Sequence, residues 1–371
     1  MKLVYLTSKY YPQTTADHFF VLEMARAFTQ ILGENFLLVV RNNQSSELEN
    51  IPHYSFGANI ERGKLLYYFF RLPFFILGKK FSGRDTVFFT NDIKLLKTLF
   101  FWKKFLHFKY RVVSDWHMLF GGENEADIIQ KSDGLITTTK HLKNLMAGRF
   151  GVPESKILAA YGGVDLDLFE KITESTETLR TRLNLPNHAF LIGYVGFYKT
   201  MGMSKGVDIM MRSLAFISDD SVKMVFVGGR PQEIEEYKKT AKEIGVSERV
   251  VFVPVVSPET VALHEKAMDA LCIPYPDKPH FREYGFPMKA YEYLAAKKPI
   301  IFSDLPIIGE VLGDCAISFT PDDAKALAKK LEEIKNNPER TKELMERAYQ
   351  KAQGCTWKAR AGKIIAFAET I

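Results

Sequence analysis

A fifteen-residue stretch, residues 282–296, carries residue types that suit a phosphorylated ligand. We expect Pro287 at the first position of a helix and Lys289 in its first turn, so that free backbone N–H groups and a positive charge could face a diphosphate. Glu292 would share a helix face with Lys289 and could accept hydrogen bonds from ribose hydroxyls. The alternative is an ordinary capped helix with an internal ion pair. The residues of this stretch assigned to the ligand are Tyr284, Gly285, Phe286, Pro287, Met288, Lys289 and Glu292.

A second loop, residues 196–206, supplies glycines and another cation. It follows an apolar strand, and its three glycines would let the backbone approach a ligand closely. Lys205 is the second candidate for the diphosphate charge, and Gly196 and Phe197 are assigned to the same ligand. An ordinary surface loop is the alternative. The loop lacks the Gly-Lys-Ser/Thr ending of a P-loop, and no G-x-G-x-x-G fingerprint follows a predicted strand, which argues against a nucleoside triphosphatase and a simple dehydrogenase.

Two further strand ends in the second half of the chain offer backbone to a ligand. Gly228 and Gly229 directly follow an apolar strand, where a glycine pair lets a nucleotide or sugar lie against the backbone; a plain turn explains them equally well. Val253 ends the next strand and could offer backbone groups to a base. Because ligands bind at the carboxyl ends of strands in open parallel sheets, we assign these residues to the ligand site.

The first half of the chain has fewer candidates. His117 follows a strand and precedes a glycine pair, which places an imidazole at a strand end, although an isolated histidine is more often structural. Loops after two other strands supply residues expected on the side of an acceptor substrate, with a simple helix cap as the alternative for the first three: Thr15, Ala16, Asp17 and Asn91.

Alternating strands and helices must position these loops. Short apolar or β-branched runs alternate with helical periodicity in both halves, which predicts an α/β protein with two Rossmann-like, doubly wound parallel-sheet domains. We place the first domain in residues 1–170, a linker in 171–189 and the second domain in 190–355, with a C-terminal helix at 356–371 that packs back on the first domain. The predicted strands are residues 3–6, 36–40, 86–90, 111–114, 134–137, 190–195, 223–227, 250–253, 270–274 and 299–302.

The composition is that of a globular protein, with 46% hydrophobic and 25% charged residues. Three cysteines that lie far apart suit a reducing compartment and argue against a disulfide framework or a zinc site. The first residues form a strand rather than a signal peptide, and no run reaches the roughly 18 apolar residues of a spanning helix. These features predict a cytoplasmic protein.

In chain order, these segments resemble the family 4 retaining glycosyltransferases of the GT-B superfamily. Residues 161–169 are similar to the family's Asn-Gly-Val-Asp segment, and Gly196 with Lys205 is similar to its Gly-Arg…Lys-Gly loop. The glycine pair at 228–229 and the helix-starting stretch follow in the same order. Three positions depart from the family pattern, namely its first glutamate, its arginine and its Gly-Gly pair, which are here Tyr284, Phe197 and Thr15-Ala16.

The resemblance implies two domains that face each other across a cleft, the first on the acceptor side and the second holding a nucleotide sugar. It implies sugar transfer with retention of configuration, in which the leaving diphosphate helps to take the proton of the acceptor. His117, Lys205, Lys289 and Glu292 would take part in catalysis, without bound metal or cofactor. Two alternatives share the architecture: a nucleotide-sugar 2-epimerase and a non-catalytic nucleotide-sugar-binding subunit.

Residues 62–111 concentrate basic and aromatic side chains. They contain twelve lysines and arginines against two acidic residues, and fifteen aromatic residues lie between positions 67 and 110. Such a segment could face anionic lipid headgroups; the protein would then be peripheral at the inner face of the cell membrane, and its acceptor a lipid-linked or cell-surface glycan precursor. Core-facing helices with lysines outside are the alternative. Nucleic acid is the least favoured partner.

Overall fold

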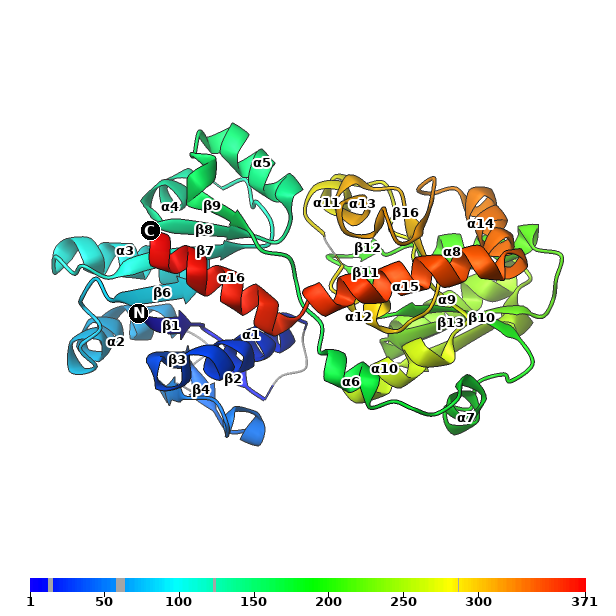
Figure 1. The fold of residues 1–371 in the computed structure, drawn as a ribbon, viewed down its shortest axis with the longest axis horizontal. Coiled ribbons are helices and arrows are strands. Elements are labelled where there is room, and N and C mark those ends of the chain that lie inside the picture. The colour runs from blue at the N-terminus through cyan, green and yellow to red at the C-terminus, as the bar shows by residue number, and fades with distance from the viewer. Residues whose placement is uncertain (13–15, 58–63, 123–124, 286) are drawn as a thin grey trace. The chain divides into compact units, whose positions relative to one another are not determined.

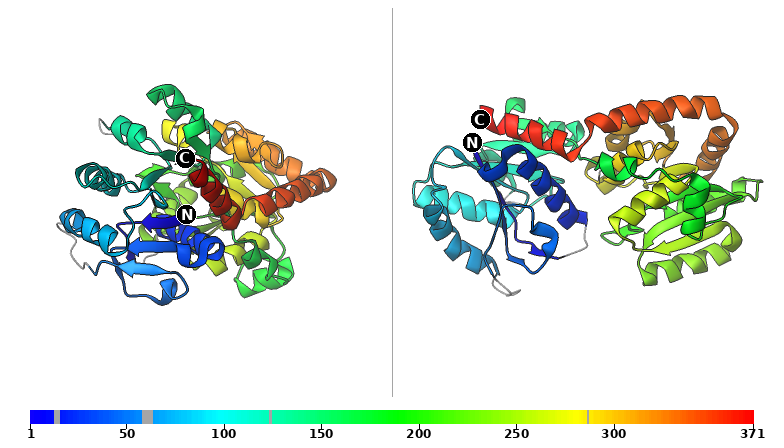
Figure 2. Two further views of the ribbon diagram at one scale, coloured as in Figure 1. Left: turned by 60° about the vertical axis from the view of Figure 1, so that its left-hand side comes forward. Right: turned by 60° about the horizontal axis from the view of Figure 1, so that its bottom comes forward.

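The chain folds into two α/β units, each built on one large parallel sheet with helices on both faces (Figure 1, Figure 2). The computed structural model describes residues 1–12, 16–57, 64–122, 125–285 and 287–371. The first unit comprises residues 1–162 and 357–371, and the second comprises residues 163–356. The predicted α/β class with two parallel sheets is therefore confirmed.

The sheet of the first unit has seven strands, all parallel. Its strands are β1 (Lys2–Leu6), β3 (Phe36–Val40), β5 (His53–Ser55), β6 (Thr86–Thr90), β7 (Arg111–Trp116), β8 (Gly134–Thr137) and β9 (Ile157–Ala159). Its helices are α1 (Ala16–Leu32), α2 (Lys64–Gly78), α3 (Ile93–Phe105), α4 (Glu125–Lys131), α5 (Lys140–Phe150) and α16 (Trp357–Thr370). The strand order is β5-β3-β1-β6-β7-β8-β9, in which Val4 of β1 pairs with Leu37 and Phe88. A strand between two helix layers is apolar on both faces, which explains the continuous apolar run of β1.

The sheet of the second unit has six parallel strands. They are β10 (Phe190–Val195), β13 (Val222–Gly229), β14 (Val250–Pro254), β15 (Ala270–Ile273), β16 (Ile300–Ser303) and β17 (Ile317–Phe319), and a small hairpin is formed by β11 (Lys199–Thr200) and β12 (Met203–Ser204). The helices are α6 (Leu166–Glu170), α7 (Thr176–Arg182), α8 (Val207–Ser213), α9 (Pro231–Glu243), α10 (Pro258–Ala267), α11 (Pro279–Glu283), α12 (Lys289–Ala295), α13 (Pro306–Leu312), α14 (Ala324–Asn336) and α15 (Pro338–Gly354). The strand order is β14-β13-β10-β15-β16-β17. The chain winds outward from β10 in one direction and then in the other, so the order reverses between β10 and β15.

In the two large sheets the sequence missed three of the described strands, and all are short. β5, β9 and β17 have three residues each. A three-residue run is too short to show the alternation or the apolar stretch by which a strand is recognised. Each completes a sheet at its edge, where it pairs with a strand that the sequence did predict.

The two units meet in sequence near Gly162, earlier than the linker expected at 171–189. Residues 171–189 fold as part of the second unit, where the side chain of Arg180 is buried and donates to the carbonyl of Ala267 and to the carboxylate of Asp269. After α15 the chain returns to the first unit as α16, which packs against α1. The apolar residues expected on the buried face of this helix are buried: Trp357, Ile364, Ile365 and Ala368.

No helix in the part of the chain that the structure describes is long and apolar enough to span a bilayer.

Candidate functional site

Three loops of the second unit pack together beside the point where the strand order reverses. A Cβ atom at Gly228, where φ is 102°, would lie 2.9 Å from the backbone of Gly196, which follows β10. A Cβ atom at Gly206, where φ is 88°, would lie 1.7 Å from the carbonyl oxygen of Pro274, which follows β15. Only glycine fits at these contacts. The loops therefore meet at the carboxyl edge of the sheet, where ligands bind in open α/β folds.

The side chain of Lys289, from the start of α12, ends inside this junction. A Cβ atom at Gly196 would lie 3.0 Å from its Nζ, so the glycine leaves room for the ammonium group. Lys289 is 7% exposed, and its Nζ lies 3.4 Å from the centroid of the Tyr194 ring. Among the described residues this Nζ has no hydrogen-bond partner. A buried ammonium that contacts an aromatic ring and lacks a hydrogen-bond acceptor can accommodate an anion that supplies one.

Two lysines share this site, and both have lowered pKa values. Burial and then the charge of Lys205 hold the pKa of Lys289 well below its ordinary value, while Glu292 opposes the shift. Burial lowers the pKa of Lys205 to about 8, and Glu233 opposes that shift. Burial disfavours the charged form of both lysines, the charge of Lys205 further disfavours that of Lys289, and a bound anion would oppose these effects. The pair therefore suits a negatively charged ligand.

The loop that carries Lys205 is anchored at its base. The backbone N–H of Lys205 donates to the carbonyl of Tyr198 over 2.9 Å. Tyr198 is fully buried, and its hydroxyl donates to the carbonyl of Phe226 over 2.6 Å. A Cβ atom at Gly229 would lie 2.4 Å from the Tyr198 ring, so this glycine makes room for the anchor. The tip of the loop is exposed, but its basic end is held against the sheet.

Two carboxyl groups lie near Lys289. Burial raises the pKa of Glu292, and Lys289 opposes that shift. Glu265, on α10, is fully buried, and neither of its carboxylate oxygens has a hydrogen-bond partner among the described residues. Burial and then Glu292 raise the pKa of Glu265 well above its ordinary value, against the effect of Lys289. The sequence did not single out Glu265, because a glutamate among polar neighbours on a helix looks like a surface residue.

In the first unit, His117 follows β7 and is half-buried beside a buried ion pair. Asp115 and Arg360 form a bidentate ion pair with distances of 3.0 and 2.9 Å, and both are buried. Burial by itself raises the pKa of Asp115, but Arg360 and His117 together hold it below its ordinary value. The Nε2 atom of His117 lies 3.4 Å from the Asp115 carboxylate, and its ring contacts the Phe20 ring at 4.6 Å. The imidazole is therefore oriented from two sides.

Arg360 also ties the C-terminal helix to the sheet, since its guanidinium donates to the carbonyls of Ala160 and Tyr161. The sequence missed this residue. Its position on the apolar face of α16, three residues after Trp357 and four before Ile364, is the signal that could have found it.

The residues expected on the acceptor side lie around other strand ends of the first unit. Asp17, in the first turn of α1, forms an ion pair with Lys9. Asn91 follows β6 and is half-buried. Thr15 and the side chain of Ala16 lie outside the described residues. The structure thus places Asp17 at the start of α1 and Asn91 in the loop after β6.

Most of the second unit matches one family of known proteins. Residues 175–351 match the model of the family Glycosyl transferases group 1. The second unit belongs to this family. The resemblance expected from the sequence is therefore confirmed at the level of group 1 glycosyl transferases.

Curated relatives carry the same kind of activity in their names. A D-inositol 3-phosphate glycosyltransferase of Xylanimonas cellulosilytica is 28% identical over 184 residues, which are 48% of this chain and 42% of the relative. Another, of Corynebacterium aurimucosum, is 24% identical over 251 residues, which are 65% of this chain and 57% of the relative. The chain spans about half the length of the curated relatives it matches.

Solved structures match the chain over its whole length. A glycosyltransferase of Rickettsia africae has a TM-score of 0.79 at 14% identity and covers 100% of this chain and 98% of its own. The Anabaena protein Alr3699/HepE in complex with UDP has a TM-score of 0.78 at 14% identity and covers 100% of both chains. The chain therefore has the GT-B fold that the sequence predicts.

The start of α12 in the second unit differs from what the sequence predicts. The helix begins at Lys289, so Pro287 precedes it instead of occupying its first position. The N–H groups of Ala290 and Tyr291 donate to the carbonyls of Pro287 and Met288 over 3.0 Å each. Two of the N–H groups at the start of this helix are therefore already used within the chain, and the lysine side chains supply positive charge at the site.

The segment before α12 of the second unit contributes to this site a residue that the sequence analysis did not single out. His280 lies on α11, and a Cβ atom at Gly285 would lie 3.1 Å from its ring. Burial and then Lys205 lower the pKa of His280. Tyr284 donates its N–H to the His280 carbonyl over 3.0 Å. Phe286 lies outside the described residues.

The remaining residues assigned to the ligand in the second unit lie around the carboxyl edge of its sheet. Arg230 stacks over the Phe197 ring, with its guanidinium carbon 5.0 Å from the ring centroid. The Val253 carbonyl lies 3.5 Å from the Tyr198 hydroxyl, which ties β14 to the loop after β10. A role of these residues in binding a ligand stays a prediction.

Proposed function

We propose that the protein is a glycosyltransferase that moves a sugar from a nucleoside diphosphate sugar to an acceptor hydroxyl. One observation carries this proposal: the buried Nζ of Lys289 has no hydrogen-bond partner among the described residues, and Lys205 lies close enough to lower its pKa. A diphosphate would give both ammonium groups an acceptor and offset their repulsion. Glu292, three residues after Lys289, would accept hydrogen bonds from the ribose.

A protein of the same fold indicates which donors to test first. The Anabaena protein that shares this fold was solved with UDP and, in another structure, with UDP-glucose. UDP-sugars are therefore the first donors to test, and the base and the sugar stay open within the proposal.

We propose transfer with retention of configuration. In this reaction the acceptor oxygen bonds to the anomeric carbon on the face from which the diphosphate leaves, and the proton of the acceptor passes to a phosphate oxygen. Lys205 and Lys289 would stabilise the negative charge that grows on the leaving group. His117, which Asp115 orients, is assigned to the donor sugar or phosphate on the family resemblance alone.

The lysines could supply the charge that a metal ion supplies in other transferases. Among the described residues, no group of three or more His, Cys, Asp or Glu side chains is placed to hold a metal ion. We propose that turnover is independent of divalent cations. Activity that survives EDTA treatment would agree with this, and activity restored only by added Mg²⁺ or Mn²⁺ would contradict it.

The acceptor is proposed to be a lipid-linked or cell-surface glycan precursor, on the strength of the basic and aromatic surface described below. Because curated relatives are named for D-inositol 3-phosphate, that compound is the water-soluble acceptor to test beside it.

A nucleotide panel followed by product analysis tests the function. Titration calorimetry with UDP, GDP, ADP and CMP should show one diphosphate bound well above the others. Incubation of the matching sugar donor with acceptors should give a glycoside whose anomeric configuration, read by NMR, equals that of the donor. An epimerised nucleotide sugar from donor alone would indicate the 2-epimerase instead. Binding of nucleotide without any turnover would indicate a non-catalytic subunit, and no nucleotide binding would contradict the site.

A further inference from the structure

Helix α2 is apolar on two faces. One face packs into the first unit through the buried side chains Tyr68, Leu72, Phe75 and Ile76. The other face carries four large apolar side chains spaced four, four and three residues apart, which are 54–75% exposed: Leu66, Phe70, Phe74 and Leu77. A helix on the surface of a domain needs a single apolar face to fold, so the second face calls for another role.

Helix α3 extends this apolar surface. Phe101 and Phe105 are 46% and 64% exposed, and their rings stack at 5.8 Å. Phe69 connects the two helices, because its ring lies 4.9 Å from Phe101 and 5.4 Å from Phe70. The indole N–H of Trp102 donates to the Phe69 carbonyl over 2.7 Å and fixes the helices side by side. We define the α2–α3 patch as Leu66, Phe70, Phe74, Leu77, Phe101 and Phe105.

Basic side chains accompany the patch. The exposed ones on these helices and directly after α2 are Arg71, Lys79, Lys80, Lys94, Lys97 and Lys104. The acidic residues of this region are engaged elsewhere: Asp92 accepts hydrogen bonds from the first N–H groups of α3, and Asp85 lies 3.7 Å from Lys2. The surface therefore combines exposed aromatic rings with positive charge that neither of these acidic residues, Asp85 and Asp92, neutralises.

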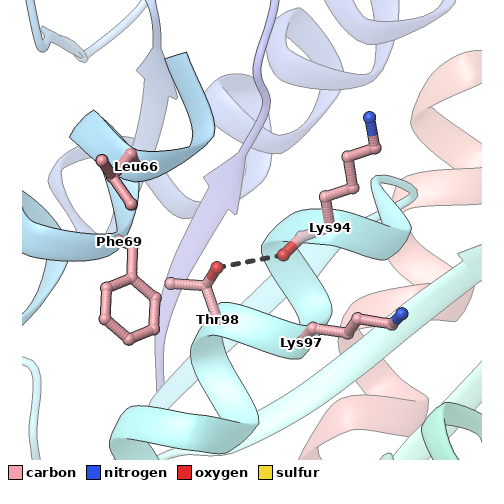
Figure 3. A pocket seen from close by; sticks show the side chains of 5 residues that line it. All are labelled: Leu66, Phe69, Lys94, Lys97 and Thr98. Carbon is pink, nitrogen blue, oxygen red and sulfur yellow. Dashed lines mark hydrogen bonds between the residues drawn. The ribbon is translucent and has the colours of Figure 1, made fainter. Parts of the chain in front are cut away.

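An open cavity of about 330 Å³ lies between the two helices (Figure 3). Leu66 and Phe69 of α2 face Thr98 of α3, while the side chains of Lys94 and Lys97 extend from α3 away from these apolar groups. The Thr98 hydroxyl already donates to the Lys94 carbonyl over 3.0 Å. The cavity thus has an apolar side formed by Leu66 and Phe69, and the two lysines at its α3 side carry their ammonium groups away from it, a combination that suits a lipid headgroup with its first methylene groups.

We propose that the α2–α3 patch binds the surface of a bilayer that contains anionic phospholipids, with headgroup phosphates beside Lys94 and Lys97. The aromatic side chains would enter the boundary between headgroups and acyl chains, and the lysines would remain at the level of the phosphates. Charge complementarity favours an anionic lipid surface as the partner of this patch, because a second copy of the chain would bring like charges together. Lipid binding needs no sugar donor, so it is tested independently of the proposed transfer reaction.

Vesicle flotation with the full chain tests this proposal. The protein should float with vesicles of phosphatidylcholine and phosphatidylglycerol and bind about tenfold more weakly to phosphatidylcholine alone or at high salt. Phe70→Ser with Phe74→Ser, and separately Lys94→Glu with Lys97→Glu, should each weaken binding to the anionic vesicles about tenfold or more.

Matched controls come from the second unit. Phe216→Ser removes a phenylalanine that is 52% exposed, and Lys239→Glu with Lys242→Glu reverses two exposed charges on α9. These variants should float as the wild type does. Circular dichroism and UDP titration establish that each variant is folded. Equal flotation of patch and control variants, or no binding to anionic vesicles, would overturn the proposal. Self-association that only the patch variants abolish would instead show an interface between copies.

Discussion

Replacement of Lys289 by methionine should stabilise the ligand-free protein. Methionine keeps most of the length and the apolar contact with Tyr194, but it removes a buried ammonium that has no hydrogen-bond partner among the described residues. An unsatisfied buried polar group costs about 1–3 kcal/mol, so the free energy of unfolding should rise by an amount of that order. With about 2–4 °C for each kcal/mol, the midpoint of thermal unfolding should rise by roughly 2–12 °C.

The gain in stability should depend on pH with a definite sign. Burial lowers the pKa of Lys289 in the folded chain, so the wild type carries the full penalty below that lowered pKa. Above the ordinary pKa of lysine, folded and unfolded forms are both neutral and the penalty vanishes. The difference in unfolding free energy between variant and wild type should therefore shrink as the pH rises, which chemical denaturation at several pH values measures.

The same substitution should weaken the binding of UDP. A hydrogen bond to a charged group contributes about 1.5–3 kcal/mol, which corresponds to a rise of about 10–150-fold in Kd. Titration calorimetry measures this change. The variant should thus be more stable and bind less well, a combination that general damage to the fold does not produce.

Lys298→Met is the matched control. Lys298 lies two residues before β16, at the opposite edge of the sheet, and burial lowers its pKa to about 8. Its Nζ lies 3.1 Å from the Thr176 hydroxyl oxygen. This variant should leave the Kd for UDP unchanged. A lowered unfolding midpoint for Lys289→Met, or a Kd within about twofold of the wild type, would refute the idea that Lys289 is an unpaired cation that awaits a phosphate.

Further predictions concern single residues in both units. UDP binding should weaken as the pH rises through about 8, where Lys205 loses its charge, and calorimetry on Lys205→Gln should show a weaker and flatter pH profile. Gly206→Ala should lower the free energy of unfolding by at least about 1–3 kcal/mol, because φ is 88° and the added Cβ would clash with the Pro274 carbonyl. A negligible loss of stability in urea denaturation would show that the loop adapts. Asp115→Asn should cost about 3–5 kcal/mol by leaving Arg360 buried without its counter-ion. Addition of Arg360→Met should recover part of that loss in the same assay, and no recovery would contradict the pairing.

Local pattern predicted most of the strands because their residues are buried on both faces. β3 and β6 have the predicted bounds, because each is an apolar or β-branched run with polar or turn-forming residues at both ends. The C-terminal helix was predicted from its apolar face in the same way. The start of α12 was harder to place, because Pro287 fits the first position of a helix equally well as a residue just before it.

The candidate site was predicted in part, for a related reason. Glycines and lysines after strands mark the carboxyl edge of a parallel sheet, so Gly196, Lys205 and Lys289 could be assigned without a structure. Glu265 could not, because its burial follows from the packing of α10 on the sheet and on α7 rather than from its neighbours in sequence. The contact of Tyr194 with the Lys289 ammonium could not be predicted either, because the two residues are 95 positions apart in the sequence.

The sequence by itself determined the alternation of strands and helices and the residues that end each strand, because both depend on periodicities within ten or fifteen residues. Only the tertiary structure decided what those residues meet. It buries Lys289 without a hydrogen-bond partner in the described chain, brings Arg360 to Asp115 and leaves the second face of α2 exposed. Burial and charge pairing arise between segments far apart in the chain, and a local pattern carries no information about such distant neighbours.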